Sequence, residues 1–463
     1  MSEITLTIPS QDTSFIITII VSVVLLGAAH LIKAIKGGSG KDLFNFKRDY
    51  KEATKKLNTG QKNNTESTFI GRAYRKQIYI SNNAKHIFVC GTTGSGKTVA
   101  LSNFIKSGLT YNYPILIVDG KGDNGAGSLL DIVNQLKGNR KVYVINLSEP
   151  ETSDKYNPFK NTNPDIIKDM LINMTDWSEE HYKYNTERYV QRLCSLLELS
   201  EITISFDSLI KYLSVYNFIS LSKRLTEKGI ITKEEHLENM EITKTSGKIA
   251  ESAAARFSTI KESKLGKIFD DNGIDIYSAL EQNAIILFIL NPLLYPEMSP
   301  LFGKLIVIDS KKAVSKFYKH KKDRIFYILD EINTYASSNL IDLVNKSRSA
   351  NITCILATQS LSDLNIISEH FKEQVIENCN NYIVLRQNSS TNAENWSNVL
   401  GTKKTMEATY QIKDNQETNL GTLKRTREYI YHPDDIKQLR TGNAIYLSRD
   451  EMFHSKIEIN KSF

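Results

Sequence analysis

The chain has 463 residues, too many for one ordinary hydrophobic core, so we expect a protein of two or three domains. Its hydrophobic content of 40% and charged content of 24% are typical of folded proteins and argue against a largely disordered chain. The 59 basic and 52 acidic residues give a net charge of +7, a bias too mild to indicate a polyanionic partner by itself. The four cysteines lie far apart in the sequence, which argues against a zinc site or a disulfide framework and favours a reducing compartment.

The first predicted element is an apolar helix near the N-terminus. Phe15–Ile32 is a run of 18 residues without Asp, Glu, Lys or Arg, and as a helix it spans about 27 Å, enough to cross a membrane. The basic residues that follow it are Lys33, Lys36, Lys41, Lys47 and Arg48. The positive-inside rule then predicts a single-pass protein of the inner or plasma membrane, with the rest of the chain in the cytoplasm. The alternatives are a cleaved signal peptide, which needs a preceding basic region, and a buried core helix.

A phosphate-binding loop follows the first clear strand, which is predicted over His86–Cys90. The loop consists of Gly91, Thr92, Thr93, Gly94, Ser95, Gly96, Lys97 and Thr98, and a helical segment follows it. This is a complete Walker A motif in a strand-loop-helix context. Its glycines let backbone N–H groups face phosphate oxygens, Lys97 reaches the β- and γ-phosphates of ATP, and the Thr98 hydroxyl is a ligand for Mg²⁺.

Far downstream, a second apolar strand is predicted over residues 324–329, and it ends in Asp330 and Glu331. This pair has the form of a Walker B motif. We expect Asp330 to hold Mg²⁺ through water and Glu331 to polarise the water that attacks the γ-phosphate. The alternative is a pair of acids that caps the following helix, but two acids after a buried strand are costly without a cation.

Two further residues are candidates for the same chemistry. Gln359 follows a third strand, predicted over Ile352–Ala357, and can sense the γ-phosphate between the two Walker motifs; a strand-ending Gln without a role is the alternative. Arg348 ends a helix predicted over Leu340–Arg348 and can reach the phosphates of a neighbouring subunit. A cation at a helix C-terminus is also favoured by the helix dipole, and the residues alone leave the two readings of Arg348 open.

Strands alternate with helices over most of the chain, which predicts a parallel sheet with helices on both faces. The predicted fold class is α/β: a RecA-like P-loop motor domain with an inserted all-α domain, preceded by one transmembrane helix. The predicted division is 1–38 for the N-terminal tail and transmembrane helix, 39–68 for a linker, 69–164 and 270–463 for the motor, and 165–269 for the insert. Residues 243–267 of the insert are rich in Lys, which fits either a nucleic-acid contact or a solvated helix face.

These motifs, in this order, resemble the type IV secretion coupling proteins of the TraG/TraD kind, in the FtsK/HerA superfamily. The resemblance runs from about Phe69 to the end of the chain. It includes the two Walker segments, VDGKGD at 118–123, YNPF at 156–159, ATQSLSDL at 357–364, NAENWSNVLGTK at 392–403 and HPDDIKQLRTGNAIYL at 432–447. It implies the RecA-like fold with a helical insert, and it implies that Arg348 is a finger acting in trans. Many members have two membrane helices, whereas one is predicted here.

The resemblance implies a homo-hexameric ATPase that couples DNA, as a non-specifically held single strand, to a secretion channel. The implied partners are relaxase or relaxosome proteins, type IV secretion channel components and the membrane. One alternative function is a DNA-segregating translocase of the FtsK kind, although no winged-helix DNA reader is visible. Another is a membrane receptor for secreted proteins that nucleotide only switches, although Glu331 would then have no task.

Overall fold

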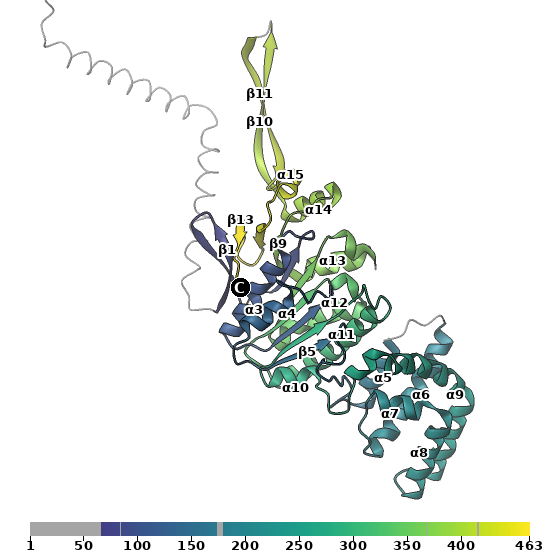
Figure 1. Cartoon of the computed structure of the whole chain (residues 1–463). Helices are drawn as coiled ribbons and strands as arrows, with labels where there is room; N and C mark the ends of the chain where they lie inside the picture. The colour runs from purple at the N-terminus through teal and green to yellow at the C-terminus, as the bar shows by residue number, and fades with distance from the viewer. Residues whose placement is uncertain (1–65, 84, 174–178, 367, 414–415) are drawn as a thin grey trace, which may run out of the picture. The chain divides into compact units, whose positions relative to one another are not determined.

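The computed structural model describes residues 66–463, except 84, 174–178, 367 and 414–415 (Figure 1). The predicted transmembrane run Phe15–Ile32 lies outside these residues, as does most of the predicted linker. In the part that is described, no helix is both long and apolar enough to cross a membrane. The first strand begins at Ser67, so the last two positions of the predicted linker belong to the sheet.

An 11-stranded sheet forms the centre of the fold, in the order β2-β1-β13-β12-β9-β3-β8-β7-β4-β6-β5. Its strands in chain order are β1 (Ser67–Ala73), β2 (Lys76–Ser81), β3 (His86–Cys90), β4 (Ile115–Asp119), β5 (Val142–Asn146), β6 (Ile285–Ile289), β7 (Ile325–Asp330), β8 (Ile352–Thr358), β9 (Cys379–Val384), β12 (Asn443–Ser448) and β13 (Phe453–Ile459). Every residue of β3, β4, β6, β7 and β8 is buried. Continuous apolar runs of this kind suit strands that are covered on both faces.

The sheet is parallel only from β9 to β5. Beyond β9 it continues through β12, β13, β1 and β2, and each of these strands pairs antiparallel with its neighbour. The predicted parallel sheet is therefore confirmed from β9 to β5, whereas the antiparallel strands beyond β9 were not predicted from the sequence. Two of these pairings, β1–β2 and β12–β13, are hairpins with short turns, and strands joined in this way can only pair antiparallel.

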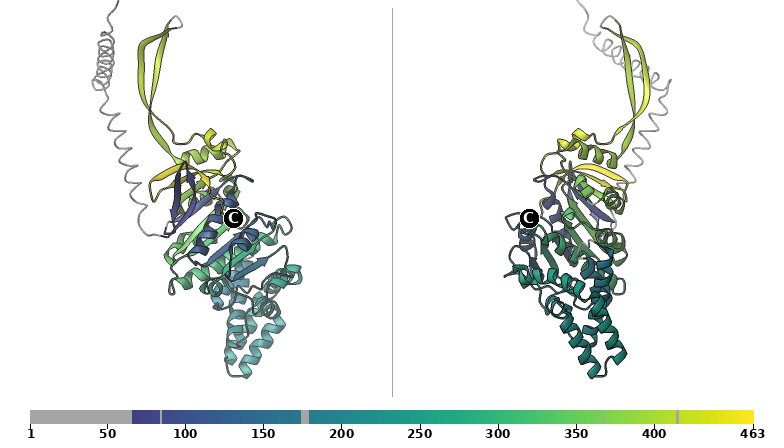
Figure 2. Two further views of the ribbon diagram at one scale, coloured as in Figure 1. Left: turned by 60° about the vertical axis from the view of Figure 1, so that its left-hand side comes forward. Right: turned by 90° about the vertical axis from the view of Figure 1, so that its right-hand side faces the viewer.

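Helices cover both faces of the sheet, as the alternation of elements predicts (Figure 2). The helices of the motor are α3 (Lys97–Thr110), α4 (Leu129–Leu136), α10 (Ile276–Glu281), α11 (Met298–Phe317), α12 (Ser338–Ser347), α13 (Glu369–Asn378), α14 (Ser390–Leu400) and α15 (Pro433–Lys437). Short 3₁₀ segments are η2 (Lys264–Ile268), η3 (Ile332–Thr334), η4 (Arg348–Ala350) and η5 (Ser362–Ile366). One apolar core joins α3 and α4 to the sheet, and a second joins α11, α12 and α13 to the opposite face.

Between β5 and β6 the chain forms a cluster of helices, visible in Figure 1. They are α5 (Pro164–Asn173), α6 (Glu180–Leu199), α7 (Phe206–Leu213), α8 (Val215–Glu227) and α9 (Lys233–Glu262). The longest, α9, starts with a capping box in which Thr232 and Glu235 satisfy each other's backbone N–H groups. The chain enters and leaves this cluster beside Tyr156, whose hydroxyl donates to the buried Asp309 carboxylate at 2.8 Å.

A long hairpin follows α14 and was not predicted from the sequence. It consists of β10 (Thr402–Lys413) and β11 (Gln416–Tyr429), which pair with each other in a two-stranded sheet of their own. Figures 1 and 2 show the hairpin extending from the region of α14 and α15. Its strands carry charged and polar residues without a clear apolar alternation, which is why the pattern gives no strand signal.

Candidate nucleotide site

The Walker A loop turns from β3 into α3, whose first residue is Lys97. Gly94 has φ 75° and Gly96 has φ 110°, in the left-handed region that favours glycine. The loop is tied together by the Ser95 hydroxyl, which donates to the Thr92 carbonyl at 2.6 Å. Thr98 is the second residue of α3, so its hydroxyl lies in the first turn, where the helix dipole and free N–H groups favour a phosphate.

The Walker B acids lie directly beside this loop because β3, β8 and β7 are adjacent parallel strands. Asp330 is the last residue of β7, and Glu331 follows with φ 47° and ψ 53°. The Lys97 ammonium donates to Glu331 Oε1 and lies 3.6 Å from Asp330 Oδ1. All three side chains are buried, so their charges interact in a medium of low polarity.

The pKa values of the site follow from this burial. Burial lowers the pKa of Lys97, but the neighbouring carboxylates of Asp330 and Glu331 outweigh it and the net shift is upward. Burial raises the pKa of the Asp330 carboxyl, although Lys97 opposes the shift. The site therefore holds a charged lysine against two acids, a balance that an incoming polyphosphate and its cation would change.

Gln359 joins the two Walker motifs through its side-chain amide. Its Nε2 donates to Glu331 Oε1 at 3.0 Å, and its Oε1 accepts a hydrogen bond from the Thr93 hydroxyl at 3.2 Å. The structure thus brings Lys97 together with Asp330, Glu331 and Gln359, which lie far downstream in the sequence. Gln359 therefore lies between the P-loop and the Glu331 carboxylate, and its sensing of the γ-phosphate stays a prediction.

Three buried oxygens around the loop accept no hydrogen bond from the described protein atoms. They are Glu331 Oε2, Thr92 Oγ1 and Gln387 Oε1. Buried polar atoms in folded proteins are nearly always satisfied, so such a group marks a place for water, a cation or a ligand. The residues present therefore fit a nucleotide with Mg²⁺: an anion-binding helix N-terminus, a lysine, a threonine hydroxyl and two carboxylates.

Asp119 is a site residue that reasoning from the sequence did not single out. It ends β4 and lies opposite Asp330 in the paired strands. Its carboxylate accepts hydrogen bonds from the Lys121 and Gly122 N–H groups at 2.8 and 3.1 Å. Burial, together with the charge of Asp330, raises the pKa of Asp119 to about 7. The signal was present in the VDGKGD segment, where an acid follows a buried strand just as it does in Walker B.

A second overlooked contact reaches the P-loop from near the end of the chain. The Gly442 N–H donates to the Ser95 carbonyl at 3.0 Å, and the Thr441 hydroxyl donates to the Gly94 carbonyl at 3.3 Å. Both residues belong to the HPDDIKQLRTGNAIYL segment. The sequence marks this segment as part of the resemblance but gives no hint that it touches the phosphate-binding loop.

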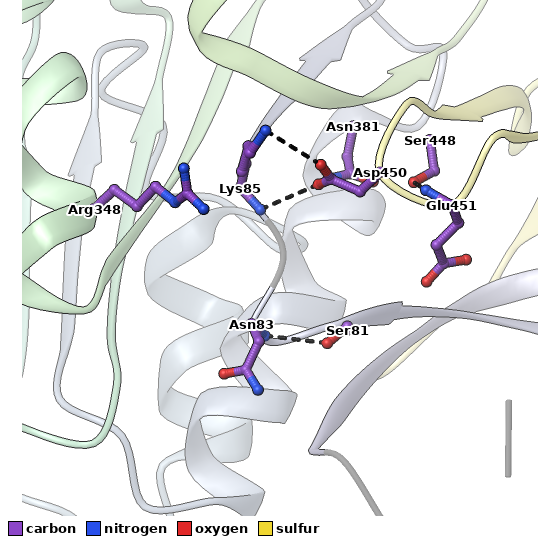
Figure 3. A pocket seen from close by; sticks show the side chains of 8 residues that line it. All are labelled: Ser81, Asn83, Lys85, Arg348, Asn381, Ser448, Asp450 and Glu451. Atoms are coloured by element: carbon purple, nitrogen blue, oxygen red, sulfur yellow. Dashed lines mark hydrogen bonds and ion pairs between the residues drawn. The ribbon is translucent and has the colours of Figure 1, made fainter. Parts of the chain in front are cut away.

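Arg348 lies away from these residues, at the opposite edge of the sheet. It follows α12 and precedes β8, whereas Gln359 follows β8. The seven residues of β8, at about 3.3 Å each, separate Arg348 from the nucleotide edge by roughly 20 Å. Its side chain is exposed and lines a pocket of about 210 Å³ with Lys85 and Asp450, which form an ion pair at 3.6 Å (Figure 3).

Three lysines of the basic stretch 243–267 form ion pairs within the chain. Lys244 pairs with Glu241 at 2.6 Å, Lys261 with Asp207 at 2.9 Å and Lys267 with Glu151 at 2.6 Å. These pairs lie at the surface or between the insert and its connections. These contacts fit a solvated helix face, and a contact of this stretch with nucleic acid stays a prediction.

Two protein families match the chain, each over one part. Residues 69–292 match the family described as the central domain of the helicase HerA, and residues 324–441 match the family described as the TraM recognition site of TraD and TraG. A protein of unknown function from Mycoplasma pneumoniae is 31% identical over 100 residues, which are 21% of this chain and 67% of that protein.

Solved structures with a similar fold include the unbound bacterial conjugative coupling protein TrwBdeltaN70, with a TM-score of 0.63 and 18% identity over 88% of this chain and 91% of that one. The plasmid coupling protein TrwB in complex with the non-hydrolysable GTP analogue GDPNP has a TM-score of 0.62 and 16% identity over 88% and 92%. VirB4 of Thermoanaerobacter pseudethanolicus has a TM-score of 0.53 and 12% identity over 86% and 97%. At these identities the likeness concerns the fold.

Proposed function

The chain belongs to the type IV secretion coupling ATPases of the TraG and TraD kind, and on that premise we propose that it is a membrane-anchored motor that moves DNA toward a secretion channel. The observation that carries the proposal is the contact set of Lys97, Asp330, Glu331 and Gln359 at one edge of the sheet. A protein that only switches with nucleotide has no use for a carboxylate held beside the P-loop lysine.

Each residue has a separate task in hydrolysis. A bound γ-phosphate competes with the two carboxylates for the Lys97 ammonium, which leaves Glu331 free to accept a hydrogen bond from the attacking water. Gln359 keeps the Glu331 carboxylate in place while this exchange happens. Mg²⁺, held by Thr98 and through water by Asp330, would neutralise charge on the β- and γ-phosphates.

The membrane anchor and the orientation of the protein across the membrane are part of the proposal. Phe15–Ile32 has the length and composition of a membrane helix, and the basic residues after it favour a cytoplasmic motor. We place the protein in the inner or plasma membrane on this basis. Deleting the first 36 residues should release the ATPase from the membrane fraction, whereas protease cleavage of the motor from outside intact cells would overturn the orientation.

The partners follow from the family. Residues 324–441 match a recognition site for TraM in TraD and TraG, which supports contact with relaxosome proteins or a relaxase, and with channel components. We propose a homo-hexameric ring that grips single-stranded DNA through its phosphates without reading its sequence. Such binding weakens steeply with salt, so a salt-insensitive preference for one short sequence would contradict it.

The decisive experiment separates nucleotide binding, hydrolysis and movement in the full chain in detergent. Lys97→Ala should lose nucleotide affinity, whereas Glu331→Gln should bind ATP but hydrolyse it at least about a hundredfold more slowly. Wild-type protein should displace streptavidin from a biotinylated single strand in the presence of ATP, and Glu331→Gln should not.

A matched control is Glu373→Gln, which removes an exposed carboxylate from α13 and should leave all three readouts unchanged. Normal turnover by Glu331→Gln would mean that another group acts as the base. Hydrolysis without any displacement of streptavidin would support the ATPase activity but contradict the proposed movement of DNA.

A further inference from the structure

The base of the β10–β11 hairpin has two faces of different character. Its strands pair in continuous register from Thr402 opposite Tyr429 to Glu407 opposite Lys424. Side chains alternate between the two faces of a strand, and directly opposite residues share a face. The register therefore shows on which face of the hairpin each side chain of the base lies.

One face consists of complementary cross-strand pairs. Lys403 lies opposite Glu428, and Glu407 lies opposite Lys424, with a Thr–Thr pair between them. Opposite charges and hydroxyl pairs of this kind stabilise a two-stranded sheet. These pairs therefore add a modest stabilisation to the base, beside the backbone hydrogen bonds of the ladder.

The other face carries only positive charge. Lys404 lies directly opposite Arg427, and the next pair on the same face is Met406 opposite Arg425. All four side chains are exposed, and Met406 is 39% exposed. No acidic residue occupies this face between the described pairs Thr402–Tyr429 and Met406–Arg425. We call these four residues the cationic face.

A like-charged pair directly across two strands destabilises a hairpin, and isolated hairpins are only marginally stable. A bound anion would offset the repulsion between the two cations. We propose that the cationic face binds the phosphate backbone of the nucleic acid that the motor moves. The inference rests on the proposed function, since it names the surface that holds the motor's substrate.

The dimensions of the face fit this occupant. Arg425 and Arg427 are two positions apart on β11 and so are spaced by about 6.8 Å, which lets them contact different phosphates of one strand. A membrane surface fits less well, because in the described base the opposite face carries Glu407 and Glu428 and has no apolar side chain to enter the lipid.

The hairpin is also joined to the nucleotide site. The Tyr429 hydroxyl donates to Asn398 Oδ1 at 3.1 Å and the Ile430 N–H to the Gly401 carbonyl at 3.0 Å, which fixes the base to α14. From there the chain runs through α15 to Thr441 and Gly442, which hydrogen-bond the P-loop backbone. A phosphate contact on the cationic face is thus one short segment away from the loop that holds ATP.

The first test uses two double variants of the full chain in neutral-lipid nanodiscs, with a fluorescent single-stranded oligonucleotide as the probe. Lys404→Gln with Arg427→Gln removes two charges from the cationic face. Lys403→Gln with Lys424→Gln removes two charges from the opposite face of the same strands. The first variant should bind about tenfold more weakly at about 100 mM salt and lower the slope of log K against log salt by about 1.4, whereas the control should lose much less.

A second test reports contact directly. The four natural cysteines are buried, so a single introduced cysteine can be labelled selectively with a photo-crosslinker. Met406→Cys places the label on the cationic face and Thr405→Cys places it on the other. The oligonucleotide should crosslink to the first variant and only weakly to the second.

The outcomes distinguish this inference from the proposed function. If wild-type protein binds and moves the strand while both double variants bind it equally, the cationic face does not bind the strand, but the proposed motor function is supported. If wild-type protein binds no nucleic acid, both are wrong. If the difference between the two double variants disappears in discs of anionic lipid, lipid headgroups occupy the face and the assignment to nucleic acid is overturned.

Discussion

At the scale of single residues, Glu331 is held in a backbone conformation that costs free energy. A non-glycine residue in the left-handed region costs about 1–3 kcal/mol and persists only where its surroundings fix it. Three contacts do so: the Glu331 N–H donates to Asp330 Oδ1 at 3.0 Å, and its carboxylate accepts from Lys97 and from Gln359. The strain aims a carboxylate at the P-loop that a regular strand would direct elsewhere.

Gln359 is the neutral member of this set, so its removal tests positioning without changing charge. Gln359→Ala should lower kcat by roughly 10- to 100-fold and change KM for ATP by much less, because Glu331 keeps its charge but loses its partner. Steady-state ATPase rates at several ATP concentrations measure both quantities. Gln374→Ala on α13 is the control, and an unchanged kcat for Gln359→Ala would return Gln359 to a strand-ending residue without a role.

At the scale of elements, β3 is secured at its first residue as well as at the P-loop. His86 is buried, its Nδ1 accepts from the Cys354 N–H of β8 at 3.0 Å, and its Nε2 then donates to the Val344 carbonyl of α12 at 2.8 Å. Both bonds require neutral imidazole in one tautomer. Burial lowers the pKa of His86 to about 4, with the charge of Arg348 adding to the shift.

This geometry predicts acid sensitivity of the element. The folded-state pKa lies below the unfolded value of about 6.5, so the stability from neutral His86 is complete above about pH 6.5 and is lost as pH falls toward 4. The loss should be about 2 kcal/mol at pH 5. Denaturant unfolding at pH 5 to 8 should show a steeper acid loss in wild type than in His86→Gln. The exposed His370→Gln should follow wild type, and parallel curves for all three proteins would contradict the account.

The elements also show what the sequence can and cannot predict. Buried strands such as β3 and β7 are predictable because apolar residues run without interruption and end at a motif, and parallel pairing then brings Lys97 to Asp330 and Glu331. The hairpin β10–β11 is not predictable, since its sequence has no clear apolar alternation and its register depends on partners that the pattern does not reveal. The contact of Gly442 with Ser95 joins positions hundreds of residues apart and arises only from the order of strands.

At the scale of the whole molecule, the sheet separates two candidate catalytic features. The nucleotide site lies at the carboxyl ends of the parallel strands, whereas Arg348 lies at their amino ends, roughly 20 Å away. A side chain at that distance cannot touch the phosphates bound to its own chain. Arg348 can act in hydrolysis only if another copy of the chain brings its P-loop to this edge, as in the proposed ring.

The last prediction is therefore that hydrolysis needs a neighbour although nucleotide binding does not. Arg348→Ala should bind ATP normally and hydrolyse it slowly, and mixing it with Lys97→Ala should restore part of the activity, because some interfaces then pair an intact P-loop with an intact arginine. Mixing Lys97→Ala with Glu331→Gln is the matched control. Both of those residues belong to one site on one chain, so no interface in that mixture is complete.

The helix-terminal reading of Arg348 predicts a different set of results. If Arg348 serves only the dipole of α12, Lys346→Ala in the same last turn should have a comparable effect, and mixing should restore nothing. Turnover per subunit also distinguishes the two interpretations of Arg348. If the site is shared between subunits, turnover per subunit should rise with protein concentration as rings assemble. Constant turnover from dilute to concentrated protein, together with a fast Arg348→Ala variant, would leave Arg348 as a surface cation beside Lys85 and Asp450.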